Sequence, residues 1–189
     1  MGSNPTPGTQ EAMRLLITGF GPFGNVEDNP SAWLAERLGP PFRILDVSYG
    51  AVDALVEELA ADPPDALLLM GVAAGSERMR LETTGRNHVG AVADVEGIVA
   101  GPGPIDPFGP PQLGSTLWRA PVFFEENEMW EPSVDAGSYL CNYALYRCLR
   151  SLPGAAVGFL HVPLPDQMPL ERQLEVGRTI VDSILESDF

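Results

Sequence analysis

Two cysteines are the strongest nucleophiles in this chain, and their surroundings in the sequence differ. Cys141 follows the irregular, small-residue segment 133–140 and lies in or near the first turn of an expected helix. The N–H groups and the dipole at a helix N-terminus stabilise a thiolate, which is the reactive form of cysteine. Cys141 is therefore the candidate nucleophile; the alternative is a buried, inert thiol, which Cys148, deeper in the helix, fits better. Two turns apart on one helix face, the two sulfurs lie about 10 Å from each other, too far for a disulfide.

A thiol nucleophile needs a base, and His161 stands where a base is expected. It ends the apolar run 156–162, and catalytic groups of parallel sheets collect at the carboxyl ends of strands. Imidazole also has a pKa suited to taking a thiol proton. Glu82 is the candidate carboxylate to orient the imidazole, and Asp135 and Asp166 remain as alternatives.

Neither a metal nor a nucleotide cofactor is expected. The second histidine, His88, lies in a polar segment, and two histidines without metal-ligand spacing do not indicate a zinc site. The loop 19–24 satisfies the dinucleotide fingerprint GxGxxG, and Asp46 follows at about the right distance. However, Pro22 removes a backbone donor, and the next helix starts only near Pro30, too far along to hold a phosphate. A structural turn, or a small apolar pocket built on the two aromatic residues of the loop, fits better.

These candidates lie at the ends of elements that alternate between strand and helix. Strands are expected at 14–19, 42–48, 66–70, 79–84, 88–95 and 156–162, and helices at 30–38, 51–61, 139–152 and 170–186. Asn29 is the expected N-cap of the first helix, with Pro30 at its first position. The Pro- and Gly-rich segment 97–121 is expected to form a loop or lid with one helical turn. The alternation predicts an α/β protein, a single three-layer α/β/α domain with a mostly parallel central sheet.

The length and composition of the chain limit the number of domains, the cellular location and the possible partners. The 189 residues suit one domain, which we place at 13–189 after a polar tail, 1–12, expected to be disordered and not a signal peptide. No apolar run is long enough to cross a bilayer, so we expect no membrane association and a cytoplasmic location. The net charge of −15 argues against nucleic acid as a partner, because phosphate contacts need clustered Lys and Arg.

Together the motifs resemble the pyroglutamyl peptidase I (pyrrolidone-carboxylate peptidase) family of cysteine exopeptidases. The opening Thr18-Gly-Phe-Gly-Pro-Phe-Gly24, followed by Asn29-Pro-Ser31, is similar to the family's TGFxPFG…NPS signature. Ala136-Gly-Ser-Tyr-Leu-Cys-Asn142 is similar to its AGxYxCN motif, and Gly158-Phe-Leu-His-Val-Pro163 to its GFxHxP motif. Gly71-Val-Ala-Ala-Gly75, then Glu82 and Asn87, resembles the segment that carries the family's glutamate. The matches cover most of the chain.

The resemblance implies removal of an N-terminal pyroglutamyl residue from peptide substrates, with no cofactor. Cys141 would form an acyl-enzyme, His161 would take and return the proton, and Glu82 would orient His161. The lactam ring would lie between Phe20 and Phe23. Further pocket residues implied by the resemblance are Asn29, Val72, Tyr139 and Leu140. Family members assemble as dimers or tetramers, so the resemblance also implies a homodimer or homotetramer.

The departures from the family pattern lie where substrate is positioned. Glu82 is followed by Thr-Thr-Gly-Arg-Asn in place of Arg-Val-Ala-Ile-Asn, and Ser76 and Val92 stand where the family carries Arg. The Pro-rich region 97–131 is shorter than in typical members. Two alternatives therefore remain open: a divergent member that hydrolyses another small amide, and a non-catalytic small-ligand or protein-binding domain on the same fold. The sequence does not identify the physiological substrate or the role of 97–121.

Overall fold

A six-stranded sheet forms the centre of the molecule in this computed structural model, which describes residues 12–125 and 127–187. Its strands, in spatial order, are β2 (Phe42–Leu45), β1 (Leu15–Phe20), β3 (Ala66–Val72), β8 (Ala156–Val162), β4 (Met79–Glu82) and β7 (Trp130–Ser133). The β4 and β8 pair is antiparallel, and all other neighbours are parallel. The predicted mostly parallel sheet is therefore confirmed. The predicted tail, 1–12, lies outside the described residues except for its last position.

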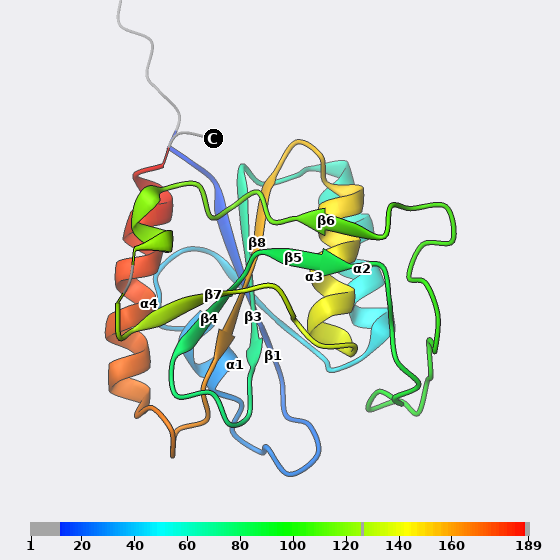
Figure 1. Ribbon diagram of the computed structural model, residues 1–189, viewed down its shortest axis with the longest axis horizontal. Coiled ribbons are helices and arrows are strands. Elements are labelled where there is room, and N and C mark those ends of the chain that lie inside the picture. Colours follow the sequence, from blue (N-terminus) through cyan, green and yellow to red (C-terminus); the bar gives the residue numbers. More distant parts are fainter. Residues whose placement is uncertain (1–11, 126, 188–189) are drawn as a thin grey trace, which may run out of the picture.

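Helices cover both faces of this sheet (Figure 1). On one face lie α2 (Tyr49–Ala61) and α3 (Leu140–Ser151), and on the other lie α1 (Pro30–Ala35) and α4 (Leu170–Leu185). Strand side chains alternate between the two faces: Leu68 belongs to the core under α1 and α4, and Leu69 to the core under α2 and α3. Because its strands are buried on both sides, the sheet needs continuous apolar runs, as in β3. The three-layer α/β/α arrangement is as predicted.

The start of α1 shows how local sequence places the first loop of the sheet. Asn29 caps α1 by accepting a hydrogen bond from the Ser31 amide at 3.0 Å, and Pro30 occupies its first position, both as predicted. The helix ends at Ala35, earlier than predicted. A Cβ atom on Gly19 would lie 2.5 Å from the Ser31 carbonyl oxygen, so glycine is required for α1 to pack this closely on β1.

The region between β4 and α3 departs most from the predicted elements. The strand expected at 88–95 does not form, because Val89 and Ala93 make only isolated bridges and the Asp94 carboxylate holds a turn through the amides of Glu96 and Ile98. The strand expected at 79–84 ends at Glu82, and a separate two-stranded ribbon follows from β5 (Thr84–Arg86) and β6 (Gln112–Gly114). The expected helical turn lies at 121–124, at the very end of the Pro-rich segment.

No helix in the described part of the chain is both long and apolar enough to cross a membrane.

Candidate active site

The candidate site forms on the face of the sheet that carries α3. Alternation along β8 directs Phe159 and His161 to this face, and the same alternation along β4 directs Arg80 and Glu82 there. In the antiparallel ladder Arg80 lies directly opposite His161, and Glu82 lies opposite Phe159. The diagonal neighbours Glu82 and His161 are therefore within side-chain reach of each other.

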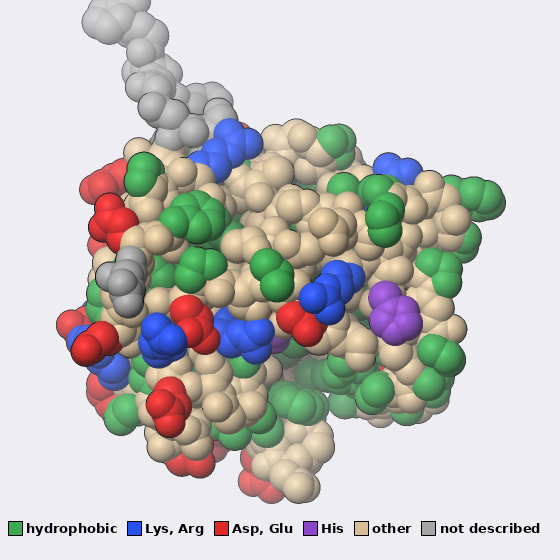
Figure 2. All heavy atoms as spheres, in the orientation of Figure 1, with side chains coloured by type: hydrophobic (Ala, Val, Ile, Leu, Met, Phe, Trp, Pro, Cys, Tyr) green, Lys and Arg blue, Asp and Glu red, His purple; other side chains and the backbone are tan. Residues whose placement is uncertain are grey.

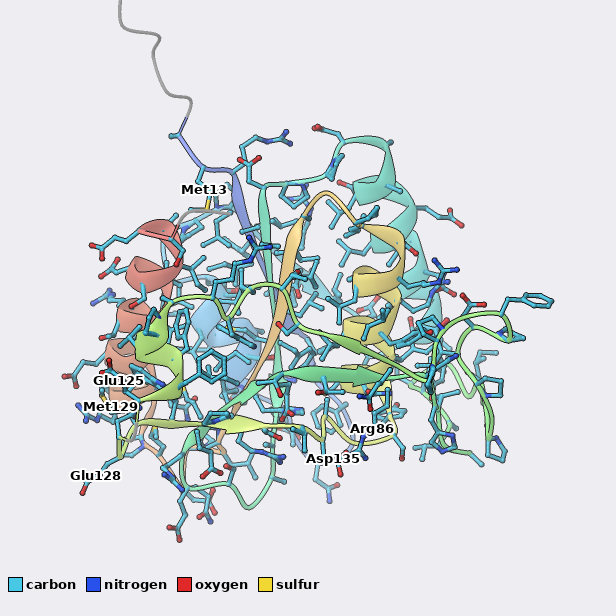
Figure 3. All side chains as sticks on the ribbon, turned by 45° about the horizontal axis from the view of Figure 1, so that its top comes forward. Met13, Arg86, Glu125, Glu128, Met129 and Asp135 are labelled. Atoms are coloured by element: carbon cyan, nitrogen blue, oxygen red, sulfur yellow. The ribbon has the colours of Figure 1, made fainter. Side chains whose placement is uncertain are left out.

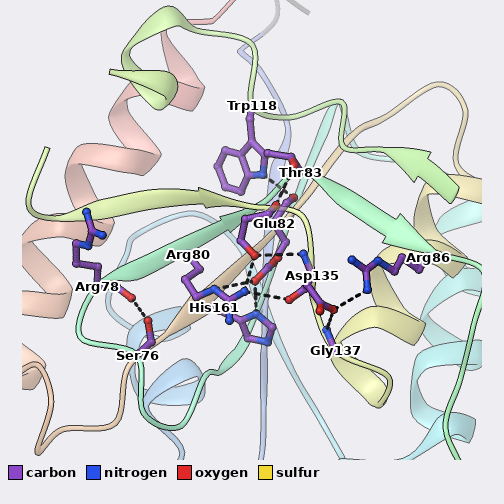
Figure 4. A network of polar contacts seen from close by, with 11 residues as sticks. Ser76, Arg78, Arg80, Glu82, Thr83, Arg86, Trp118, Asp135, Gly137 and His161 are labelled. Atoms are coloured by element: carbon purple, nitrogen blue, oxygen red, sulfur yellow. Dashed lines mark hydrogen bonds and ion pairs between the residues drawn. The ribbon is translucent and has the colours of Figure 1, made fainter. Parts of the chain in front are cut away.

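His161 and Glu82 are in direct contact. The Nδ1 atom of His161 lies 2.7 Å from Oε1 of Glu82, whose side chain is fully buried (Figure 4). The indole N–H of Trp118 donates to the Glu82 carbonyl oxygen at 3.0 Å, which fixes the backbone at this point. Of the three carboxylates considered from the sequence, Glu82 is the one that contacts His161. The carboxylate of Asp135 pairs instead with Arg86, and Asp166 is exposed.

Cys141 is placed in the first turn of α3, as predicted. Tyr139 is the N-cap residue, and no side chain in the described structure caps this helix end, so the first N–H groups point into the site. A Cβ atom on Gly71 would lie 2.9 Å from the Cys141 sulfur, which shows that the thiol packs directly over β3. Cys148 is buried in the same helix, and burial raises the pKa of its thiol to about 12. Only Cys141 therefore combines partial exposure with a helix N-terminus.

The electrostatics of the site favour a charged imidazole. Burial alone would lower the pKa of His161, but the charge and hydrogen bond of the Cys141 sulfur, together with the Glu82 carboxylate, raise it to about 9. At neutral pH this supports an imidazolium in contact with the Glu82 carboxylate and close to the Cys141 sulfur. A positive charge beside a cysteine favours the thiolate, which is the form that attacks a carbonyl carbon.

A cavity of about 420 Å³ opens beside these residues. Eight of the nine site residues proposed from the sequence line it, namely Phe20, Phe23, Asn29, Val72, Tyr139, Leu140, Cys141 and His161. The ninth, Glu82, lies behind the imidazole. Asn29 shapes the rim, because its side-chain amide donates to the Gly21 carbonyl at 2.9 Å while its oxygen accepts from Ser31. Phe20 is buried and Phe23 half-buried, so the cavity offers aromatic surface to a small ligand.

Three residues that contribute to the site were not singled out from the sequence. Gly71 leaves room for the sulfur; its position as a glycine near the end of a buried strand was the available signal. Asn142 follows the nucleophile and joins α3 to the preceding ribbon through both backbone groups of Arg86 and the carbonyl of His88. Arg80 lines the cavity from β4, and its spacing of two from Glu82 was the available signal.

Comparison with known proteins agrees with this architecture. The family model described as pyroglutamyl peptidase matches residues 13–187. The chain is 31% identical to the pyrrolidone-carboxylate peptidase of Pyrococcus furiosus, over 92% of this chain and 99% of that protein. It is 36% identical to the protein of the same name from Deinococcus radiodurans, over 79% and 77% of the two chains. The structure of pyrrolidone carboxyl peptidase from Thermococcus litoralis superposes with a TM-score of 0.81 at 25% identity, covering 92% of this chain and 94% of that one.

Proposed function

This chain belongs to the pyroglutamyl peptidase family, and we propose that it uses Cys141, His161 and Glu82 to remove an N-terminal pyroglutamyl residue from peptides. Its class is that of a cysteine peptidase, in agreement with the family match and with the matching peptidases. The observation that carries the assignment of residues is the 2.7 Å contact between His161 and Glu82 beside a cysteine at a helix N-terminus. This arrangement supports the roles of nucleophile for Cys141, base for His161 and orienting group for Glu82, which lies behind the imidazole.

The reaction divides into two steps. The Cys141 thiolate attacks the carbonyl carbon of the pyroglutamyl residue, and the N–H groups at the start of α3, which no side chain caps in the described structure, can donate to the carbonyl oxygen as negative charge develops on it. As the C–N bond breaks, His161 gives its proton to the leaving nitrogen, and a thioester with Cys141 remains. A water molecule then loses a proton to His161 and attacks the thioester, which releases pyroglutamate and restores the thiolate and imidazolium. Glu82 keeps the imidazole oriented through both steps.

The aromatic end of the cavity suits the lactam ring. Phe20 and Phe23 supply apolar faces for a neutral five-membered ring, and polar groups along the rim can orient its amide. Phe20 ends β1, and the loop that follows it and carries Phe23 is held by the hydrogen bonds of Asn29, so the pocket is formed before substrate binds. A cavity of about 420 Å³ also has room beyond the ring for part of the leaving group.

Hydrolysis of a pyroglutamyl fluorogenic amide by the wild type and by Cys141→Ser tests this proposal. We expect turnover by the wild type and loss of turnover in the variant. A folded wild type that leaves the amide intact would contradict the activity, and turnover that survives in Cys141→Ser would contradict the nucleophile. Iodoacetamide provides a matched comparison within one protein, since it should modify Cys141 and leave the buried Cys148 unmodified.

Two expectations from the sequence stay predictions. A homodimer or homotetramer is testable by size-exclusion chromatography with light scattering, where a mass equal to one chain would contradict it. The cytoplasmic location is testable by fractionation of the cells that make the protein.

A further inference from the structure

A second cavity adjoins the proposed catalytic pocket and extends it toward the edge of the sheet. It measures about 690 Å³ and lies between the loop after β3 and the end of β7, which is one of the two edge strands of the sheet. The two cavities share four lining residues, Ala73, Ala74, Arg80 and Asp135. We call this second cavity the edge groove. Acidic and basic side chains alternate in a band across this face of the molecule (Figure 2).

The carboxylates near the junction of the two cavities already have basic partners. Glu131 is paired with Arg78, and the carboxylate of Asp135 lies 3.2 Å from Arg86 (Figure 3). Glu82 is engaged by His161. These anions are therefore neutralised locally. Glu77 lines the edge groove but not the catalytic pocket, so its charge acts farther from the reacting atoms.

Arg80 differs from the other cations of this face. Its Nη2 atom donates to the Ser133 hydroxyl at 2.5 Å and to the Asp135 carbonyl oxygen at 3.1 Å, and both acceptors are uncharged (Figure 4). The nearest carboxylate oxygen, Oε1 of Glu82, lies 3.6 Å from Nε and is already bonded to His161 at 2.7 Å. A guanidinium has five N–H donors, and within the described chain those of Nη1 make no hydrogen bond. The side chain is 29% exposed and lines both cavities, so a ligand in either cavity can contact it.

We propose that Arg80 binds a carboxylate on the substrate residue that follows pyroglutamate, and that the edge groove is the binding site for the leaving side of the substrate. This inference rests on the proposed function. Two sources supply the same chemistry: the free α-carboxylate of a pyroglutamyl dipeptide, or the acidic side chain of that residue in a longer peptide. Arg80 is a specificity-determining residue in either case.

The register of the sheet explains why Arg80 can reach this group. Arg80 stands directly opposite His161 in the β4–β8 ladder, and His161 must deliver its proton to the leaving nitrogen. The α-carboxylate carbon is two bonds from that nitrogen, about 2.5 Å away. A leaving group placed to receive the proton from His161 therefore carries its carboxylate next to the guanidinium.

Paired substrates test the proposal on the wild-type enzyme. Pyroglutamyl-alanine against pyroglutamyl-alaninamide isolates the α-carboxylate, and the amidated dipeptides pyroglutamyl-glutamate amide and pyroglutamyl-glutamine amide isolate the side chain. In at least one pair we expect kcat/KM to be about tenfold higher for the charged member, the size of effect typical of a charge-assisted hydrogen bond. Ratios near one in both pairs would overturn the proposal.

Two variants assign the effect to Arg80. Arg80→Gln should bring the ratio close to one, while Arg80→Lys should retain part of it. Arg78→Gln is the matched control, because Arg78 lies in the edge groove but not in the catalytic pocket and is already neutralised by Glu131. If Arg80→Gln and Arg78→Gln lower the ratio of kcat/KM values equally, the effect comes from the general electrostatic field and not from a binding contact, which would contradict the proposal.

Binding measurements separate this inference from the proposed activity. In Cys141→Ala, calorimetry should show about tenfold tighter binding of the charged peptide, and the added Arg80→Gln change should remove the difference. If a folded wild type hydrolyses none of the peptides, the proposed function fails, and the calorimetric comparison still decides whether Arg80 binds a carboxylate. Equal affinities for charged and amidated peptides would refute it.

Discussion

Gly71 is the residue whose replacement tests most directly where the Cys141 sulfur must lie. It stands beside His161 in the β3–β8 ladder, and a Cβ atom at this position would lie 2.9 Å from the Cys141 sulfur and 2.9 Å from Cζ of Phe159. Favourable contacts between such atoms need about 3.5 to 4.0 Å, so Gly71→Ala pushes the sulfur or the ring away by about 0.6 to 1.1 Å. The sulfur is at the end of a short side chain in the first helical turn, and its displacement changes the line of attack on the carbonyl carbon.

The expected effect on activity is much larger than the expected effect on stability. A misplacement of about 1 Å at a reacting atom costs about 100-fold in rate, so we expect kcat/KM on a pyroglutamyl fluorogenic amide to fall between about 10- and 100-fold. Overpacking of this size lowers the free energy of unfolding by about 1 to 3 kcal/mol, which urea denaturation measures. Gly114→Ala is the matched control, because a Cβ atom on Gly114 meets no described heavy atom within 4 Å.

A folded Gly71→Ala enzyme with the kcat/KM of the wild type would refute this reasoning. It would mean either that Phe159 alone gives way, or that the sulfur is not held against β3 during the reaction. The rate of alkylation by iodoacetamide distinguishes a displaced sulfur from a blocked substrate pocket, since the small reagent does not need the lactam site.

Three further predictions concern charge and anchoring. Glu82→Gln keeps an oxygen for His161 Nδ1 but removes the charge, so kcat/KM should fall by about 100-fold or more. The midpoint of the His161 ring titration, followed by NMR, should also move to lower pH. An unchanged midpoint would contradict the ion pair. Because the pKa of folded His161 is about 9 against 6.5 in the reference state, its protonation adds stability that is complete below pH 6.5 and lost as pH rises through about 9. The difference in free energy of unfolding between the wild type and His161→Gln, measured by urea denaturation, should therefore shrink over that pH range. A difference that stays constant with pH would contradict the raised pKa of His161. Asn142→Ala leaves backbone groups of Arg86 and His88 unpaired, so the free energy of unfolding should fall by about 2 to 4 kcal/mol in urea denaturation. Thr179→Ala, on the surface, is the control. A loss of stability smaller than that of the control would contradict the anchoring role of Asn142.

The sequence predicts those elements whose signals are local. The apolar runs of β3 and β8 and the cap at Asn29 depend on neighbouring residues, and the structure has them where they were expected. The edge strand β7 was not predicted, because Trp130–Ser133 includes a proline and becomes a strand only by pairing with β4. The strand expected at 88–95 failed for the opposite reason: its composition suits a strand, but Asp94 satisfies nearby amides within a turn.

In the candidate site, likewise, some residues have local sequence signals and others are placed by strand pairing. The motifs pointed to Cys141 and His161, each of which occupies the end of an element that the sequence predicts. The contact of Glu82 with His161 depends on the antiparallel register of β4 and β8, which no local pattern encodes. Arg80 was not identified from the sequence for the same reason, because its place in the pocket follows from its position opposite His161 in the sheet.

The two halves of the site therefore differ in how closely they follow the family. The residues proposed to hold the lactam ring lie on segments that match family motifs, whereas the leaving side is built from the segment where Ser76 replaces an Arg of the family pattern and Arg80 supplies a cation from β4. The loss of this Arg at Ser76 changes the charge of the edge groove, where Arg80 is proposed to bind the leaving group, and does not change the ring pocket. On this argument, divergence in this chain concerns the residue after pyroglutamate, and selectivity for pyroglutamate itself should persist. Hydrolysis of prolyl and pyroglutamyl amides with the same leaving group tests whether this selectivity is retained. Comparable rates of hydrolysis of both amides would contradict the prediction.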